Sequence, residues 1–346
     1  MLWLLLLGAL GLACALTPDA GGADVPPQVG ESLVLAGTDP GRLFHGEAAP
    51  GSVRVRSTYL AGAPGAVSYE EGRDFTVDYA AGAVRRTEGS RIPDYRRNSL
   101  YGKRDFNHQD FPGFGNYRDF VFVDYQPRRS VEGWPRQAPQ AQVLEATRRK
   151  LAAGGILKVC AFGDSITAGG DATAPELIYW QRWLAALRLR HPSATITGVN
   201  SATGGDTTVQ GLARLEDKVL REQPDLVLVA FGMNDQNVGS VPEATFRANL
   251  GELVDRVRAR TGAEVILLSS CLPNPNWHYT SGRMEAYGRI TGEVATDRKC
   301  AFAEVLANWK VLVDRKKPED LLANNVNHPN DFGHWVYFQV LERLGL

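Results

Sequence analysis

The amino-acid sequence predicts an α/β protein whose larger part is a five-stranded parallel sheet with helices on both faces, preceded by a small β-rich domain. Its 346 residues are 44% hydrophobic and 22% charged, which suits two packed domains and excludes a disordered or fibrous chain. After a proline-rich stretch at 127–139, the hydrophobic pattern changes from period two to alternating strands and helices. The five apolar runs that follow are separated by helical patterns, as the crossovers of a parallel sheet require.

The N-terminus carries an apolar run from Leu2 to Leu16, which is shorter than the roughly 20 residues that a membrane-spanning helix needs. It ends in Ala13-Cys14-Ala15, and we expect residues 1–15 to be a secretory signal peptide. The residues around Cys14 are also similar to a shifted bacterial lipoprotein signal, in which Cys14 would carry a lipid anchor. Both interpretations place the mature protein outside the cytoplasm, either secreted or periplasmic or anchored to a membrane.

Residues 16–50 are rich in Gly, Pro, Ala and Asp without periodicity, and we expect an irregular lead-in there. Residues 51–126 are predicted to form a β-rich accessory domain with one long turn-rich loop at 92–116. Its short strands are expected at 52–60, 74–79, 83–86 and 119–125. The many aromatic residues and arginines of this domain could bind a glycan, but we favour packing, because a small domain needs large side chains to fill its core.

Residues 127–139 are predicted to be a linker, and residues 140–346 the α/β domain. Strands are expected at 156–162, 194–199, 225–231, 264–270 and 300–305. Helices are expected at 140–153, 175–190, 209–221, 242–260, 282–297 and 331–344. Ligands of such sheets bind beyond the carboxyl ends of the strands, so these ends are where we look for chemistry.

Charge and cysteine content exclude two classes of protein. The 38 basic and 39 acidic residues give a net charge of -1, without the basic excess of a nucleic-acid binder. Removal of the signal leaves Cys160, Cys271 and Cys300. Cys271 and Cys300 fall at opposite ends of neighbouring strands, beyond disulfide reach. We expect three free, mostly buried thiols rather than a disulfide-built fold.

A serine with a glycine nearby follows the first strand of the α/β domain, in Gly163-Asp164-Ser165. A serine on a strand-to-helix turn can be held exposed as a nucleophile, with its own backbone N–H free to bind an oxyanion. Such turns also bind phosphate or serve as purely structural loops, so the turn alone leaves these uses open.

Two further strand ends supply candidate hydrogen-bond donors. Gly205 follows the second strand, and Asn234 follows the third. Fixed donors of this kind stabilise the negative charge that develops in acyl transfer. Each is an ordinary turn residue by itself, and only their convergence at one edge of the sheet indicates a site.

A nucleophilic serine needs a base, and the candidates are His328 and His334. His328 lies in the loop ahead of the last predicted helix. His334 falls in the first turns of that helix, where it can simply pack or cap.

Together these blocks resemble the SGNH hydrolase family, also called GDSL esterases, over about residues 157–346. The motifs that carry the resemblance are Gly163-Asp164-Ser165, Gly205, Gly232-x-Asn234-Asp235 and His328-Pro329-Asn330. The resemblance implies a flavodoxin-like three-layer α/β/α fold and a serine esterase without a metal or an organic cofactor. It implies Ser165 as nucleophile, His328 as general base, and an oxyanion hole made by the backbone N–H groups of Ser165 and Gly205 with the Asn234 side chain.

The chain departs from the family pattern at Asn325, where the family has an aspartate three residues before its histidine. The Asp-to-Asn change costs roughly 10⁴ in kcat in a serine protease triad. Three explanations stay open: a Ser-His dyad oriented by a backbone carbonyl, another carboxylate that reaches His328, or Asp331 and His334 as the true pair. We rank the last lowest, because Asp331 suits the start of a helix. A fourth possibility is an impaired enzyme that is kept as a binding protein.

We expect a secreted esterase for short acyl esters on small molecules or polysaccharides. Acetyl groups on carbohydrate are favoured by analogy with extracellular family members that carry an added β domain. A lipid esterase, a thioesterase or an acyltransferase would use the same site, and a non-catalytic carbohydrate-binding protein is the alternative of another class. Trp277, in the loop after the fourth strand, is our candidate for a substrate contact, although we favour the interpretation that its side chain packs in the protein interior. The sequence does not define the oligomeric state.

Overall fold

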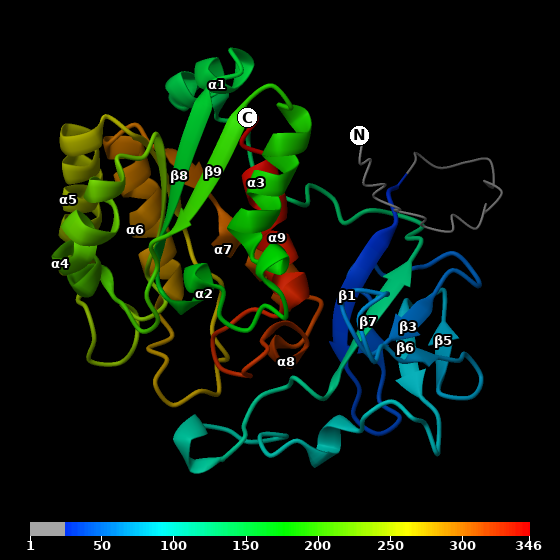
Figure 1. Cartoon of the computed structure of the whole chain (residues 1–346). Coiled ribbons are helices and arrows are strands. Elements are labelled where there is room, and N and C mark those ends of the chain that lie inside the picture. Colours follow the sequence, from blue (N-terminus) through cyan, green and yellow to red (C-terminus); the bar gives the residue numbers. More distant parts are fainter. Residues whose placement is uncertain (1–24) are drawn as a thin grey trace.

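The computed structural model describes residues 25–346, which form a β-rich region followed by a larger α/β region (Figure 1). The predicted signal peptide at 1–15, with Cys14, lies outside the described residues. Within residues 25–346, no helix is long and apolar enough to cross a membrane.

The α/β region is built on a parallel sheet of five strands. These are β8 (Ile156–Gly163), β9 (Thr195–Asn200), β10 (Leu226–Ala230), β11 (Glu264–Leu268) and β12 (Ala301–Ala303). Their order is β12-β11-β10-β8-β9, and every neighbouring pair is parallel. This is the flavodoxin-like order, in which the chain reverses direction across the sheet between β8 and β10. The predicted fold class is therefore confirmed.

Helices cover both faces of this sheet: α4, α5 and α6 lie on one side, and α3 and α9 on the other (Figure 1). The helices are α1 (Glu145–Ala152), α2 (Ser165–Ala168), α3 (Tyr179–Arg190), α4 (Thr208–Lys218), α5 (Glu243–Thr261), α6 (Met284–Asp297), α7 (Val305–Val313), α8 (Pro318–Leu321) and α9 (Asp331–Glu342). The sequence analysis did not predict α2, α7 or α8. In α7 most side chains are buried, so the helix lacks the polar face that would have revealed its period.

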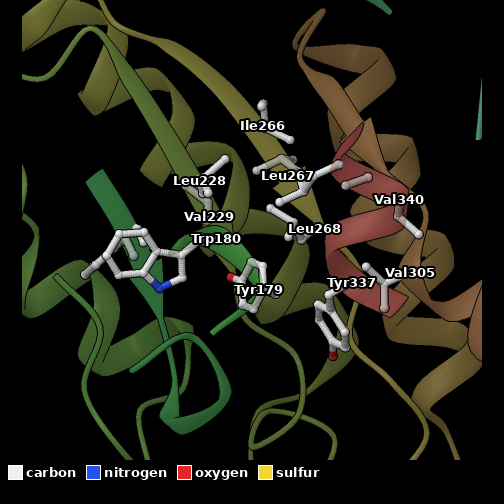
Figure 2. Packing of buried hydrophobic residues seen from close by; sticks show 14 of the residues in the cluster. Tyr179, Trp180, Leu228, Val229, Ile266, Leu267, Leu268, Val305, Tyr337 and Val340 are labelled. Atoms are coloured by element: carbon white, nitrogen blue, oxygen red, sulfur yellow. The ribbon is translucent and has the colours of Figure 1, made fainter. Parts of the chain in front are cut away.

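The core between the sheet and the α3–α9 pair also fixes the loops beyond the strands. Figure 2 shows Tyr179 and Trp180 of α3 and Tyr337 of α9 among aliphatic side chains of β10 and β11. Burial of each such side chain contributes roughly 1.5–3 kcal/mol. Their polar tips are satisfied too, because Trp180 Nε1 donates to the Thr167 carbonyl at 2.9 Å and Tyr337 Oη accepts from the Cys271 N–H at 2.8 Å. Core packing thus anchors α2, which begins at Ser165.

The β-rich region has two small antiparallel sheets. One has the order β1 (Gln28–Val34), β7 (Phe120–Tyr125), β3 (Arg54–Arg56), β4 (Ser68–Tyr69), and the other β2 (Gly41–Arg42), β6 (Ala83–Arg86), β5 (Phe75–Asp78). The four predicted strand segments contain β3, β5, β6 and β7.

The irregular lead-in predicted for residues 16–50 is corrected by β1, which pairs with β7. Gly30 has a positive φ of 69° at a register shift between Gln28 and Glu31. From Glu31 onward both faces of the strand are buried. The alternation that marks a half-buried strand is therefore absent, and the sequence pattern could not reveal it.

The β-rich region packs directly on the segment that precedes α9. Lys316 and Glu31 form a fully buried ion pair at 2.7 Å, and the Tyr125 hydroxyl and the Phe44 N–H also donate to the Glu31 carboxylate. A buried ion pair needs such added hydrogen bonds to offset its desolvation. The Val34 N–H further donates to Asp320 Oδ1 at 2.8 Å. The β-rich region thus helps to hold the loop that carries His328.

The long loop between β6 and β7 crosses from the β-rich region to the α/β region (Figure 1). It contains the short 3-10 helices η1 (Tyr95–Arg97) and η2 (His108–Asp110). Phe106 exchanges backbone hydrogen bonds with the loop after β11, donating to Asn276 O and accepting from the His278 N–H. The loop therefore lies along the edge of the sheet where the strands end.

The expectation of free, buried thiols is confirmed for the described residues, since Cys160, Cys271 and Cys300 are all buried and unpaired with one another. Burial raises the pKa of the Cys271 thiol to about 12. These cysteines serve as core residues.

Candidate active site

Ser165 stands directly beyond β8, at the point where the strand order of the sheet reverses. The Asp164 side chain caps α2 by accepting a hydrogen bond from the Ile166 N–H at 3.0 Å. A Cβ on Gly163 would approach the Ala230 carbonyl oxygen to 2.3 Å, so only glycine permits this close contact between β8 and β10. Burial raises the pKa of Asp164, beneath the serine, to about 7. The local sequence thus holds Ser165 half-buried at a fixed turn.

His328 lies next to Ser165, with its Nε2 atom 2.7 Å from Ser165 Oγ. It belongs to the segment between α8 and α9. There the Asn324 side chain accepts from the His328 N–H at 3.0 Å, and the His328 carbonyl accepts from the Ala323 N–H at 2.8 Å. Two hydrogen bonds to the His328 backbone, one through its N–H and one through its carbonyl, therefore hold the imidazole in position.

Asp171 completes a hydrogen-bonded series with these two residues. Its Oδ2 atom lies 2.7 Å from His328 Nδ1, and the two side chains are 20% and 21% exposed. A carboxylate only accepts hydrogen bonds, so Nδ1 carries the hydrogen and Nε2 is left to accept from the Ser165 hydroxyl. The arrangement is that of a Ser-His-Asp triad.

Asp171 reaches this position because of the tight turn that follows α2. The Gly170 N–H donates to the Ser165 carbonyl at 2.8 Å, and Asp171 itself has a left-handed φ of 65°. The Tyr117 hydroxyl, from the long loop of the β-rich region, donates to Asp171 Oδ1 at 2.9 Å. Burial and the Asp171 charge raise the pKa of Tyr117 above its ordinary value, which keeps this hydroxyl protonated.

Asp171 was not identified from the sequence, although the possibility that another carboxylate contacts His328 was left open. The one available signal was its position within Gly169-Gly170-Asp171, just beyond the turn that carries Ser165.

The two residues that the sequence analysis considered for this role, Asn325 and Asp331, lie elsewhere. Asn325 is buried, accepts from Asn274 Nδ2 at 3.0 and 3.1 Å through its two oxygens, and donates to the Tyr95 hydroxyl at 3.2 Å. Asp331 begins α9 and accepts from the Thr173 N–H and hydroxyl.

The environment of His334 contradicts the alternative in which Asp331 and His334 form the catalytic pair. Its side chain is fully buried, and its Nε2 atom donates to the Gly170 carbonyl at 3.3 Å. Burial lowers the pKa of His334 to about 4, so the imidazole is neutral. His334 supports the turn that carries Asp171 and does not face Ser165.

Gly205 and Asn234 stand beyond β9 and β10, at the same edge as Ser165. A Cβ on Gly204 would lie 3.8 Å from Ser165 Cβ, so this turn runs beside the serine. Gly205 has a φ of 80° with open space where a side chain would be. Asn234 Nδ2 donates to the Asp206 carbonyl at 2.9 Å, which ties it to the Gly205 turn. The amide carries a second hydrogen for an incoming oxygen.

Buried Asp235 holds these two turns together. Its Oδ1 accepts from the N–H and hydroxyl of Thr208, and its Oδ2 accepts from the Gly232 N–H at 3.1 Å. The donors are thereby fixed before any ligand arrives, which is what stabilisation of a developing oxyanion requires.

Trp277 packs between the long loop and the α/β region. It is 6% exposed, clusters with Phe106 and Val326, and donates from Nε1 to His108 Nδ1 at 3.0 Å. These contacts favour the packing role over a substrate contact.

Comparison with known proteins places these motifs in one family model. The model of the GDSL-like lipase/acylhydrolase family matches residues 161–336, a span that includes Ser165, Gly205, Asn234 and His328.

Three curated relatives are esterases by name. Esterase TesA of Pseudomonas aeruginosa is 39% identical over 142 residues, which are 40% of this chain and 66% of that protein. Thioesterase 1/protease 1/lysophospholipase L1 of Escherichia coli strain K12 is 34% identical over 135 residues, 39% of this chain and 60% of that protein. Acetylxylan esterase of Geobacillus stearothermophilus is 24% identical over 197 residues, 52% of this chain and 89% of that protein. The match thus spans less than two thirds of the first two proteins.

A similar solved structure is a two-domain esterase (CEX) active on acetylated mannans, co-crystallised with mannopentaose. It is 24% identical, with a TM-score of 0.49 over 60% of this chain and 54% of that one.

Proposed function

The chain belongs to the GDSL-like lipase/acylhydrolase family, and from this premise we propose that it is a carboxylic ester hydrolase with Ser165 as its nucleophile. The observation that carries the proposal is the series of two 2.7 Å contacts, from Ser165 Oγ to His328 Nε2 and from His328 Nδ1 to Asp171 Oδ2. A weakly nucleophilic hydroxyl is activated by an adjacent base, and the base by a group that orients it.

In the first step, Ser165 Oγ attacks the ester carbonyl carbon while its proton passes to His328 Nε2. The Asp171 carboxylate stabilises the imidazolium that forms. The developing oxyanion is bound by the N–H groups of Ser165 and Gly205 and by the Asn234 side chain. His328 then returns its proton to the leaving oxygen, and the alcohol departs from an acyl-serine.

In the second step, water takes the place of the alcohol. His328 accepts a proton from the water as it attacks the acyl carbonyl, and the same donors bind the second oxyanion. Collapse of this intermediate returns the proton to Ser165 Oγ and releases the carboxylic acid.

The proposed substrates are short acyl esters, foremost acetyl groups on carbohydrate. The name of the acetylxylan esterase relative supports this choice, together with the β-rich region that precedes the hydrolase part. We also propose that the protein is exported, on the strength of the apolar run at residues 2–16.

Hydrolysis of p-nitrophenyl acetate, butyrate and octanoate, beside the Ser165→Ala variant, tests the proposal. A serine esterase for short acyl groups loses turnover in Ser165→Ala without unfolding, and it is fastest on the acetate. Highest activity on the octanoate would instead favour a lipid esterase, and acyl transfer to added xylose in preference to water would favour an acyltransferase. Equal rates for the wild type and Ser165→Ala would refute a serine mechanism.

Two alanine variants test which histidine is the general base. His328→Ala is expected to lose activity with an intact fold. His334→Ala is expected to lose stability first, because His334 is buried in the core. A His328→Ala variant with near wild-type rates would refute the assignment.

A further inference from the structure

A cavity of about 640 Å³ lies beside the triad, where the β-rich region meets the α/β region. One wall is the loop between β3 and β4, at 57–64, and another is the turn after α2, at 171–176. Phe120 and Phe122 of β7 close it, and Tyr117 and Asp171 form its border with the triad. Its volume falls within the usual range for small-molecule sites, roughly 300–1,000 Å³.

The cavity adjoins the triad through Asp171, which contacts the end of the His328 ring that faces away from Ser165. His328 protonates the leaving oxygen, so the alcohol part of the substrate lies against the imidazole. Asp171 occupies the far end of the same ring, and both side chains are about one fifth exposed, at 21% and 20%. A chain attached to the leaving oxygen can therefore run along this exposed edge, past Tyr117, into the cavity.

The charges of the lining select against an anionic alcohol. Asp171, Glu176 and Asp331 contribute three carboxylates, and the lining contains no Lys, Arg or His. Two guanidinium groups contact lining residues from outside the cavity. Arg182 donates to the Tyr59 hydroxyl at 2.9 Å and to the Asp331 carbonyl at 3.3 Å, and Arg56 donates to the Tyr59 carbonyl at 2.7 Å. A phosphate or uronate group would thus meet three carboxylates and no cation among the residues that line the cavity.

The remaining surface suits a sugar ring. Tyr117 is 55% exposed and Leu60 41% exposed, so both can cover the apolar C–H face of a pyranose. The Tyr59 ring is held rigidly, with the Arg182 guanidinium 4.7 Å from its centroid and the Phe122 ring edge-on at 5.7 Å. Glu176 and Asp171 offer carboxylate oxygens to sugar hydroxyls.

We propose that this cavity binds the neutral sugar chain that carries the ester, and that the β3–β4 loop of the β-rich region is thereby part of the substrate site. The proposal rests on the proposed esterase function for its reaction, but binding of the sugar chain can be measured without turnover.

The test compares two tryptophan substitutions in the full chain, one at position 63 and the other at position 61. Ala63 lines the cavity and is partly buried, whereas Ala61 is exposed and outside the lining. Ala63→Trp fills the cavity, and Ala61→Trp adds the same bulk outside it. Binding of xylotetraose, mannotetraose and trigalacturonate is measured by titration calorimetry, and turnover of p-nitrophenyl acetate serves as the control for the triad.

We expect at least one neutral tetrasaccharide to bind the wild type and Ala61→Trp alike, and to bind Ala63→Trp about tenfold more weakly or worse. Trigalacturonate is expected to bind no better than the neutral sugars until Glu176→Lys supplies a cation. The p-nitrophenyl acetate rate of Ala61→Trp, which lies outside the lining, should stay within about twofold of wild type.

Three results would overturn the proposal: no binding of either neutral sugar, equal losses in the two Trp variants, or tighter binding of trigalacturonate than of the neutral sugars by the wild type. Absence of p-nitrophenyl acetate turnover in the wild type would count against the proposed function instead, and the sugar titrations would still decide the cavity.

Discussion

Replacement of Asp171 by Asn removes one charge from the triad and preserves the size of the side chain. The carboxylate oxygen lies 2.7 Å from His328 Nδ1, so Asp171 is the group that stabilises the imidazolium when Ser165 loses its proton. An amide can instead present an N–H to the imidazole and favour the wrong tautomer, as in the protease case. The substitution should therefore destabilise the transition state of the reaction and leave the stability of the fold unchanged.

The expected loss follows from the separation and exposure of the two groups. With charge centres about 4 Å apart and an effective dielectric constant of about 20, the attraction is about 4 kcal/mol. At 1.36 kcal/mol for each factor of ten, that corresponds to about 10³ in kcat. Because water screens side chains that are 20% and 21% exposed, the loss should be smaller than the roughly 10⁴ of the protease triad.

The assay is kcat on p-nitrophenyl acetate, with circular dichroism and thermal unfolding to show that the fold is intact. Asn325→Asp is the matched control, because it creates the carboxylate at the position that the family pattern expects. Asn325 is buried against Asn274 and Tyr95, so a charge there should reduce stability and give no gain in rate. A wild-type kcat in Asp171→Asn, or a faster Asn325→Asp, would refute the role of Asp171.

Three further outcomes are expected. Tyr117→Phe loses the 2.9 Å hydrogen bond that orients Asp171 toward His328, so kcat should fall about fivefold, with a loss of stability of no more than about 1 kcal/mol. An unchanged kcat would show that the hydroxyl does not position the carboxylate. Burial lowers the pKa of His334 from 6.5 to about 4, so the folded chain binds fewer protons than the unfolded one in that window, and stability should fall as the pH is lowered through it. The difference is at most about 3 kcal/mol, and urea unfolding at pH 7.5 and 4.5 should show a shallower pH dependence in His334→Gln. Lys316→Met leaves Glu31 charged and unpaired in the core and should cost roughly 3–5 kcal/mol in thermal or urea unfolding, while the added Glu31→Gln change should restore part of the loss.

The parts of the fold that the sequence predicted are those with a simple hydrophobic period. Four of the five parallel strands stand out as apolar runs because they are buried on both faces, whereas the edge strand β9 is largely exposed. Helix α7 was missed because it is buried nearly all round, and β1 because Gly30 and the buried polar residues Glu31 and Ser32 interrupt its apolar run. In each case tertiary burial removed the pattern on which sequence reasoning depends.

The residues of the candidate site likewise include some that could be predicted from the sequence and one that could not. Ser165, Gly205 and Asn234 follow three strands of one parallel sheet, so their meeting could be predicted from the position of the strand ends alone. Asp171 lies on a left-handed turn, and only its place directly after Gly169-Gly170, close to Ser165, distinguishes it among the 39 acidic residues of the chain. Asn325 signalled only that the usual carboxylate of the family is absent from its position, and the contact of Asp171 with His328 identified the carboxylate that takes its place.

The central claim is that Ser165, activated by His328, is the nucleophile, and a fluorophosphonate probe tests it most directly. An activated serine attacks the phosphorus of the probe and displaces fluoride, which leaves a phosphonylated serine. Intact-mass analysis followed by peptide mapping locates the adduct. We predict a single adduct on Ser165, formed far more slowly in His328→Ala and Asp171→Asn, with loss of activity in proportion to labelling. Labelling of another residue, or full esterase activity in protein without a modified Ser165 after saturation with the probe, would contradict the claim.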